Sequence, residues 1–160
     1  MGEHVWHKKV REEVFSKYDP ANAYQSHSEI SKLYLFNVAQ GKKPRRIDCM
    51  SDADIVVLDS DSIRITKIIE IESALNPKKI IGIVLATHLC RVCSIRSKHD
   101  EPKKYFELKD VVLEIVFKKA PPRSKKDYKL EVFKPYIDSI IKTTGGCLSK
   151  NTAVIFTPHD

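Results

Sequence analysis

Near the start of the chain, apolar residues recur with helical spacing. In its middle, they form short runs of the kind that is typical of β-strands. Trp6, Val10 and Val14 share one helical stripe, so we predict a helix over residues 3–18 that ends at Asp19-Pro20. Residues 54–59 and 65–72 are rich in β-branched side chains and enclose a short polar turn, which predicts a β-hairpin. Residues 25–40 fit either a helix or a strand, and we favour the helix.

The rest of the chain alternates helices and strands. Asn76-Pro77 marks a helix start, and apolar residues from Ile80 to Val92 surround that helix on nearly every side, so it must be well buried. Further patterns predict a strand at 111–117, a helix at 126–142 and a last strand at 153–156. This order predicts an α/β fold in which helices flank a central mixed β-sheet. The 160 residues are expected to form one domain, residues 1–160.

The net positive charge of the chain indicates which kind of partner it suits. The chain has 28 Lys and Arg residues against 21 Asp and Glu residues, a net charge of +7 that suits a polyanion. Basic residues cluster in turn-rich segments at 41–46, 91–104 and 118–126, and such loops can follow a phosphate backbone. A lysine-rich surface without a binding role is the alternative. The candidate phosphate-binding residues are Lys42, Lys43, Arg45, Arg46, Arg123, Lys125 and Lys126.

Membrane, secretion and zinc signals are weak in this sequence. The longest strongly apolar stretch, residues 80–89, is about half the roughly 20 residues of a bilayer span, so we expect no membrane segment. The first residues lack the apolar region of a signal peptide, which predicts a cytoplasmic protein with reduced cysteines. His88-x-Cys90-x-x-Cys93 supplies only part of a zinc ligand set, so we favour buried thiols on a helix.

Acidic residues occupy matching positions on the two strands of the predicted hairpin. With the turn at residues 60–63, positions pair when their numbers sum to about 123, and Asp54 then lies opposite Glu70. Alternation along the strand puts Glu70 and Glu72 on the same face. Opposed like charges destabilise a sheet, whereas carboxylate oxygens are ligands that Mg²⁺ and Mn²⁺ prefer, so we predict a divalent cation site. Glutamates on a solvated strand face are the alternative.

Ala53-Asp54 at a strand start, Glu70-x-Glu72 on the hairpin partner and a helix after it resemble the PD-(D/E)xK, or restriction endonuclease-like, nuclease superfamily. The resemblance implies a restriction endonuclease-like core and a metal-dependent DNA phosphodiesterase. It further implies that Asp54 and Glu70 hold Mg²⁺ or Mn²⁺ while a water attacks the phosphorus.

Two positions depart from the family pattern. Ala53 stands where the family has proline, and Glu72 stands where it has the lysine of E-x-K. Some members carry E-x-E, in which the second glutamate is thought to assist the metal or the attacking water. Other members take the lysine from the next helix, where Lys78 and Lys79 are available. We therefore expect Glu72 to orient or deprotonate the nucleophile and Lys78 or Lys79 to restore the positive charge.

Many members add an acid from the first helix. Glu13 leans toward the apolar stripe of that helix, so we take it as the further metal ligand, with Glu12 and Glu29 as alternatives. The functional expectation is a magnesium-dependent DNA endonuclease of restriction or junction-resolving type, working as a homodimer as its relatives generally do. The alternative is a catalytically degenerate nuclease-fold module that binds nucleic acid or serves as a structural subunit. Motifs for acyl transfer, NTP hydrolysis and dinucleotide redox chemistry are absent from the sequence.

Overall fold

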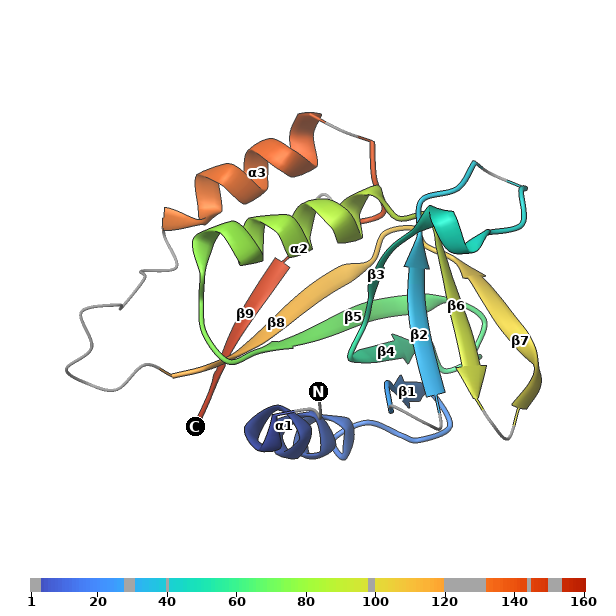
Figure 1. Ribbon diagram of the computed structural model, residues 1–160, viewed down its shortest axis with the longest axis horizontal. Coiled ribbons are helices and arrows are strands. Elements are labelled where there is room, and N and C mark those ends of the chain that lie inside the picture. Colours follow the sequence, from blue (N-terminus) through green and yellow to red (C-terminus); the bar gives the residue numbers. More distant parts are fainter. Residues whose placement is uncertain are drawn as a thin grey trace.

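The computed structural model of the chain describes residues 4–27, 31–39, 41–97, 100–119, 132–143, 145–149 and 154–160. Within these ranges the chain has an α/β architecture with two β-sheets (Figure 1). The elements are α1 (Val5–Phe15), β1 (Ala23–Gln25), β2 (Ser31–Phe36), the 3-10 helix η1 (Arg46–Asp48), β3 (Cys49–Asp52), β4 (Ile55–Leu58), β5 (Ile65–Glu72), α2 (Pro77–Leu89), β6 (Val92–Ser97), β7 (Asp100–Glu107), β8 (Val112–Lys118), α3 (Lys134–Thr143) and β9 (Val154–His159).

The larger sheet has five strands in the order β1-β4-β5-β8-β9. β4 and β5 form the predicted antiparallel hairpin, and β1 extends it with a further antiparallel strand. β5, β8 and β9 run parallel to one another, because α2 and α3 carry the chain back between them. The predicted mixed sheet is therefore confirmed.

Helices cover both faces of this sheet, as predicted. On one face Val10 and Val14 of α1 pack against Ile69, Ile71 and other apolar side chains of the sheet. On the other face α2 and α3 lie side by side, and Ile80 and Val84 enter the larger core. Figure 1 shows α1 on one side of the β4–β5 hairpin and α2 with α3 on the other. Among the described residues, no helix is both long and apolar enough to cross a bilayer.

The second sheet and the end of α2 correct three expectations. β3, β2, β6 and β7 form a four-stranded antiparallel sheet beside the first. The helix that we favoured within residues 25–40 is wrong, because β2 alternates Leu33 and Leu35 into the core and pairs with strands on both sides. The segment 91–104 is not a basic loop but β6 and most of β7. α2 ends at Leu89, before Val92.

The cysteine prediction is right about burial and wrong about the helix. Cys90 caps the end of α2, Cys93 lies in β6 and Cys147 follows α3, and all of them are buried free thiols. Burial raises the pKa of Cys90 to about 12 and that of Cys147 to about 12. These thiols stay protonated near neutral pH and act as small apolar core residues.

Candidate active site

The hairpin register brings acidic residues of β4 and β5 together. Ile55 pairs with Ile69 and Val56 with Ile68, so the same register carried one residue further sets Asp54 opposite Glu70. Asp54 is fixed there because its Oδ2 accepts a hydrogen bond of 2.8 Å from the backbone N–H of Ile71. The predicted convergence of the hairpin acids therefore occurs.

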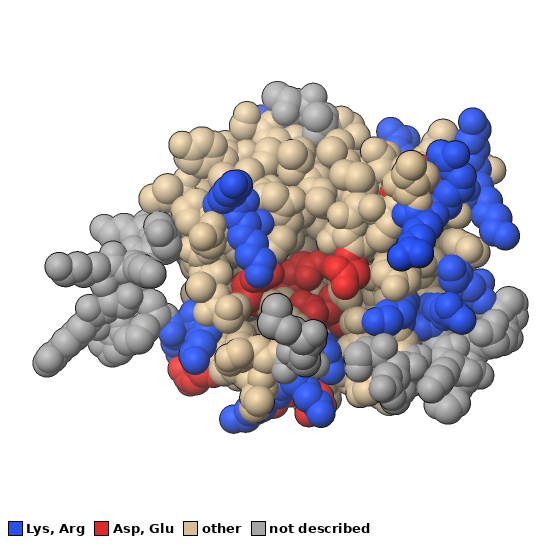
Figure 2. Space-filling model, in the orientation of Figure 1, with Lys and Arg blue, Asp and Glu red and all other residues tan. Residues whose placement is uncertain are grey.

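A pocket of about 370 Å³ opens where the two sheets meet, and four carboxylates line it. Asp52 ends β3 in the smaller sheet, and Asp54 precedes β4 in the larger one, so the short crossing between the sheets places both side chains at the pocket. Glu70 and Glu72 come from the end of β5. We call this site the acidic pocket. Figure 2 shows Asp and Glu side chains gathered in a hollow at the centre of the molecule, with basic side chains on either side.

Glu70 is one of two buried acids in this pocket, together with Glu72. It is only 7% exposed, and its Oε1 atom is buried without a hydrogen-bond partner. Burial raises the pKa of Glu70 well above its ordinary value, and the charges of Asp54, Asp52 and Glu72 raise it further, as does hydrogen bonding to Asp54. A carboxyl group in such surroundings keeps its proton to a higher pH than an exposed glutamate does, unless a cation takes the proton's place.

A lysine from α2 reaches the same pocket. Asn76 caps α2 by accepting a hydrogen bond from the backbone N–H of Lys79, and Pro77 opens the first turn. Side chains in a helix lean toward its N-terminus, so Lys79 points back over the end of β5. Its Nζ lies 2.6 Å from Oε2 of Glu72, which is itself only 7% exposed. Lys79, predicted as one of two candidates, is thus at the site.

Sequence reasoning missed Asp52 and His7. The Nε2 atom of His7 lies 3.3 Å from Oδ1 of Asp54, and His4 lines the pocket one helical turn earlier. The spacing of three residues between the two histidines is a signal for a shared helix face. Asp52 stands two residues before Asp54, but its place in the pocket depends on the junction with a second sheet, which the sequence did not predict.

Two predicted residues lie elsewhere. Glu13 does not line the pocket: its carboxylate pairs with His159 at 3.1 Å and with Lys9 at 3.7 Å. Lys78 is exposed on α2 and does not line the pocket either. The first helix therefore contributes histidines rather than Glu13 to the site.

The predicted phosphate-binding residues divide into two groups. Lys42, Lys43 and Arg45 line an open hollow on the segment that follows β2, and Arg45 pairs with Asp48 at 3.2 Å. Arg46 begins η1 in the same segment. The second group lies outside the described residues, namely Arg123, Lys125 and Lys126.

The acidic pocket supplies the type of ligand that a hard divalent cation prefers. Its four carboxylates offer only oxygen atoms, and Oε1 of Glu70 is buried and unpartnered. The described residues nevertheless contain no group of three or more His, Cys, Asp or Glu side chains already arranged around one point to hold a metal ion. Asp54 contacts His7 and Glu72 contacts Lys79, so these carboxylates must turn to face a shared ion. The residue types fit the predicted cation, and Asp54, Glu70, Glu72 and Asp52 are the candidate ligands.

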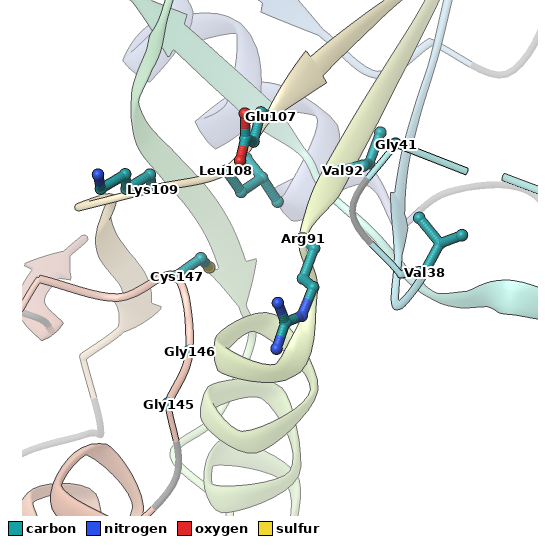
Figure 3. A pocket seen from close by; sticks show the side chains of 10 residues that line it. All are labelled: Val38, Gly41, Arg91, Val92, Glu107, Leu108, Lys109, Gly145, Gly146 and Cys147. Atoms are coloured by element: carbon teal, nitrogen blue, oxygen red, sulfur yellow. The ribbon is translucent and has the colours of Figure 1, made fainter. Parts of the chain in front are cut away.

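A second pocket of about 410 Å³ has different chemistry. It lies near the end of α2 and is lined by Arg91, Glu107 and Lys109 together with apolar residues and glycines. Figure 3 shows the Arg91 side chain extending beside the end of α2, near the backbone of Gly145 and Gly146. One carboxylate between two cations does not form an acid–base or metal-binding group.

Comparisons with protein-family models, with curated proteins and with solved structures found no match to this chain. The functional conclusion therefore depends on the residues of the acidic pocket.

Proposed function

We propose that the protein is a divalent-cation-dependent nuclease of the PD-(D/E)xK type, with a restriction endonuclease-like core, that hydrolyses DNA phosphodiester bonds. The observation that carries this proposal is Glu70, a buried carboxyl group with an unpartnered oxygen, surrounded by three further carboxylates in an open pocket. Such an arrangement is costly unless a proton or a cation neutralises it. A Mg²⁺ or Mn²⁺ ion is the neutralising partner that also supplies hydrolytic chemistry.

Asp54 and Glu70 are the principal candidate ligands. The backbone N–H of Ile71 holds one oxygen of Asp54 in place, which fixes the carboxylate relative to Glu70. Asp54 and Glu70 would hold the cation, which would supply a lowered pKa of a water molecule and neutralisation of charge on the phosphate. The chain holds Oδ2 of Asp54 through the backbone of Ile71, whereas Glu72 has to turn away from Lys79 before it can face the same ion.

Lys79 supplies the positive charge that the lysine of an E-x-K motif would supply. Its Nζ contacts Glu72, so a cationic group stands beside the position where the family pattern has lysine. Glu72 can accept a proton from the attacking water, and Lys79 orients Glu72 and offers positive charge to the phosphate. Lys78, the residue before Lys79 in α2, is exposed and has no part in this proposal.

The order of elements supports the proposed core. A helix, a hairpin, a helix, a strand, a helix and a strand follow one another around the mixed sheet, with the acids on the hairpin. The smaller sheet is an addition to this order. It supplies Asp52 to the pocket and carries further basic residues beside it.

The proposal is tested by incubating supercoiled, linear and branched DNA with the protein and Mg²⁺ or Mn²⁺. Cleavage should require the cation, and Asp54→Asn and Glu70→Gln should each lower its rate by about 100-fold or more, because several kcal/mol of transition-state stabilisation are lost. DNA binding should survive in both variants. Glu13→Gln is the matched control, and it should cleave like the unaltered protein because Glu13 lies outside the pocket. Absence of cleavage with either cation, or full activity of either pocket variant, contradicts the proposal.

A binding module without catalysis is the second candidate. The ion pair between Lys79 and Glu72, and the lack of a ready-made ligand group among the described side chains, favour it. DNA binding without cleavage under every cation condition would identify this function. A homodimer and a cytoplasmic location stay predictions.

A further inference from the structure

The outer face of the smaller sheet is built differently from its inner face. Leu33, Leu35, Cys93 and Ile95 point inward and are buried in the large core. Because side chains alternate along a strand, the residues between them point outward. We call this outer surface the tyrosine face, and its residues are Lys32, Tyr34, Ser94, Arg96 and Tyr105.

One row of the tyrosine face runs from the acidic pocket across the sheet. Asp52 pairs with Tyr34, Tyr34 with Ser94, and Ser94 with Tyr105 on successive strands. Directly paired residues have their Cβ atoms about 5 Å apart, so the two tyrosines stand on either side of Ser94. Asp52 lines the acidic pocket, and the row therefore begins at the candidate active site.

Ser94, at the centre of this row, has a side-chain oxygen without a hydrogen-bond partner. Ser94 is 0% exposed, so this Oγ atom is buried. Of the two tyrosines paired with Ser94, Tyr105 is 42% exposed and Tyr34 is half-buried. A buried hydroxyl without a partner costs free energy, and a nucleotide can satisfy it once the side chains that cover Ser94 move apart.

Positive charge borders the row. Lys32 pairs with Arg96 at the start of β2, one row beyond the tyrosines, and Arg96 is exposed. Past the other end of β2 lie Lys42, Lys43 and Arg45. Figure 1 shows the smaller sheet at the right of the molecule, and Figure 2, in the same orientation, shows basic side chains on that side, beside the central acidic hollow. The row thus has one exposed ring, Tyr105, and one half-buried ring, Tyr34, near cations. Accessible aromatic rings near cations bind single strands, because bases stack on the rings and phosphates contact the cations.

We propose that the tyrosine face binds single-stranded nucleic acid and leads one phosphodiester of that strand into the acidic pocket. The inference rests on the proposed nuclease function and names its substrate class, a single strand or a single-stranded branch. A continuous duplex does not fit this face in the same way, because its bases are stacked on each other and present only their edges. Tyr34 and Tyr105 contact the bases, while Lys32 and Arg96 contact the backbone.

The test measures binding in EDTA, where no metal-dependent cleavage takes place. Labelled oligothymidylate of about 12 nucleotides, the RNA of matching sequence and a duplex of the same length are titrated by fluorescence anisotropy. The single strands should bind more tightly than the duplex, and comparison of DNA with RNA identifies which strand is preferred. Tyr105→Ala should weaken single-strand binding by about 5- to 100-fold, because one stacked base is lost. Tyr105→Phe should restore it, because the ring is kept.

Tyr136→Ala is the matched control, since Tyr136 is an exposed tyrosine on α3. It should bind like the unaltered protein. Equal binding by Tyr105→Ala and the unaltered protein, or a duplex bound as tightly as the single strand, overturns the inference. Binding that follows the expected pattern without any cleavage in Mg²⁺ or Mn²⁺ instead removes the proposed nuclease function and leaves the binding face standing.

Discussion

Replacing Glu70 by glutamine removes the ionisable group at the centre of the acidic pocket while keeping its shape. Glu70 is buried, and burial together with the charges of Asp54, Asp52 and Glu72 raises its pKa well above the ordinary value. The folded protein therefore holds this proton more tightly than the unfolded chain, in which the pKa of glutamate is about 4.3.

The direction of the pH effect follows from that difference. Below about pH 4.3 both states are protonated and the stability contributed by the protonated Glu70 is complete. Between this pH and the raised folded-state pKa, the unfolded chain releases the proton and the folded protein keeps it, so stability falls as pH rises. Glu70→Gln has no proton to release. Relative to this variant, the metal-free protein should lose about 1.4 kcal/mol for each pH unit across the window, or about 3 to 6 °C in Tm for a chain of this size.

Denaturant unfolding followed by circular dichroism in EDTA, from about pH 4 to about pH 8, measures this difference. Glu13→Gln is the control, because Glu13 lies outside the pocket and its ion pairs are partly exposed, so its curve should run parallel to that of the unaltered protein. A stability difference between Glu70→Gln and the unaltered protein that stays constant across this range would refute the burial of Glu70 among like charges.

Three further predictions concern the helix α2, the loop before β9 and the nucleic-acid partner. Lys79→Ala should lower cleavage by about 100-fold, whereas Lys78→Ala should leave the cleavage rate unchanged. Gly146→Ala should destabilise the fold by about 1 to 3 kcal/mol, because the new Cβ would stand 2.2 Å from the backbone oxygen of His88. Gly82→Ala in the same unfolding assay should stabilise by about 1 kcal/mol, since Gly82 lies inside α2 with no atom within 4 Å of the added Cβ. Oligonucleotide affinity should fall linearly with the logarithm of salt concentration, and a flat response would contradict phosphate contacts.

The hairpin could be predicted because local and tertiary signals agree there. The β-branched strands and the polar turn predict a register that puts Asp54 near Glu70. In the structure the register shifts by one residue between Val57 and Leu58, and Ile55 then pairs with Ile69. Asn76-Pro77 also marks the start of α2 correctly. In each case the residues that carry the signal are close neighbours in the sequence.

The smaller sheet could not be predicted because its signals depend on partners far away in sequence. The run from Leu33 to Phe36 is apolar at every position, so its period does not separate a strand from a helix. Pairing with β3 and β6 decides in favour of the strand. Asp52 reaches the acidic pocket because the two sheets meet there, and His7 reaches it because of where α1 packs. The spacing of neighbouring residues does not predict either arrangement.

The central claim is that the carboxylates of the acidic pocket form a divalent cation site. Titration of the full chain with Mn²⁺ in a calorimeter, near neutral pH and in two buffers of different ionisation enthalpy, tests it most directly. The unaltered protein and Glu13→Gln should bind Mn²⁺ with release of a proton, while Asp54→Asn and Glu70→Gln should lose that binding, because ligand oxygens are removed from the pocket. Mn²⁺ binding that is equally strong in Glu70→Gln, or absent from the unaltered protein, would contradict the claim.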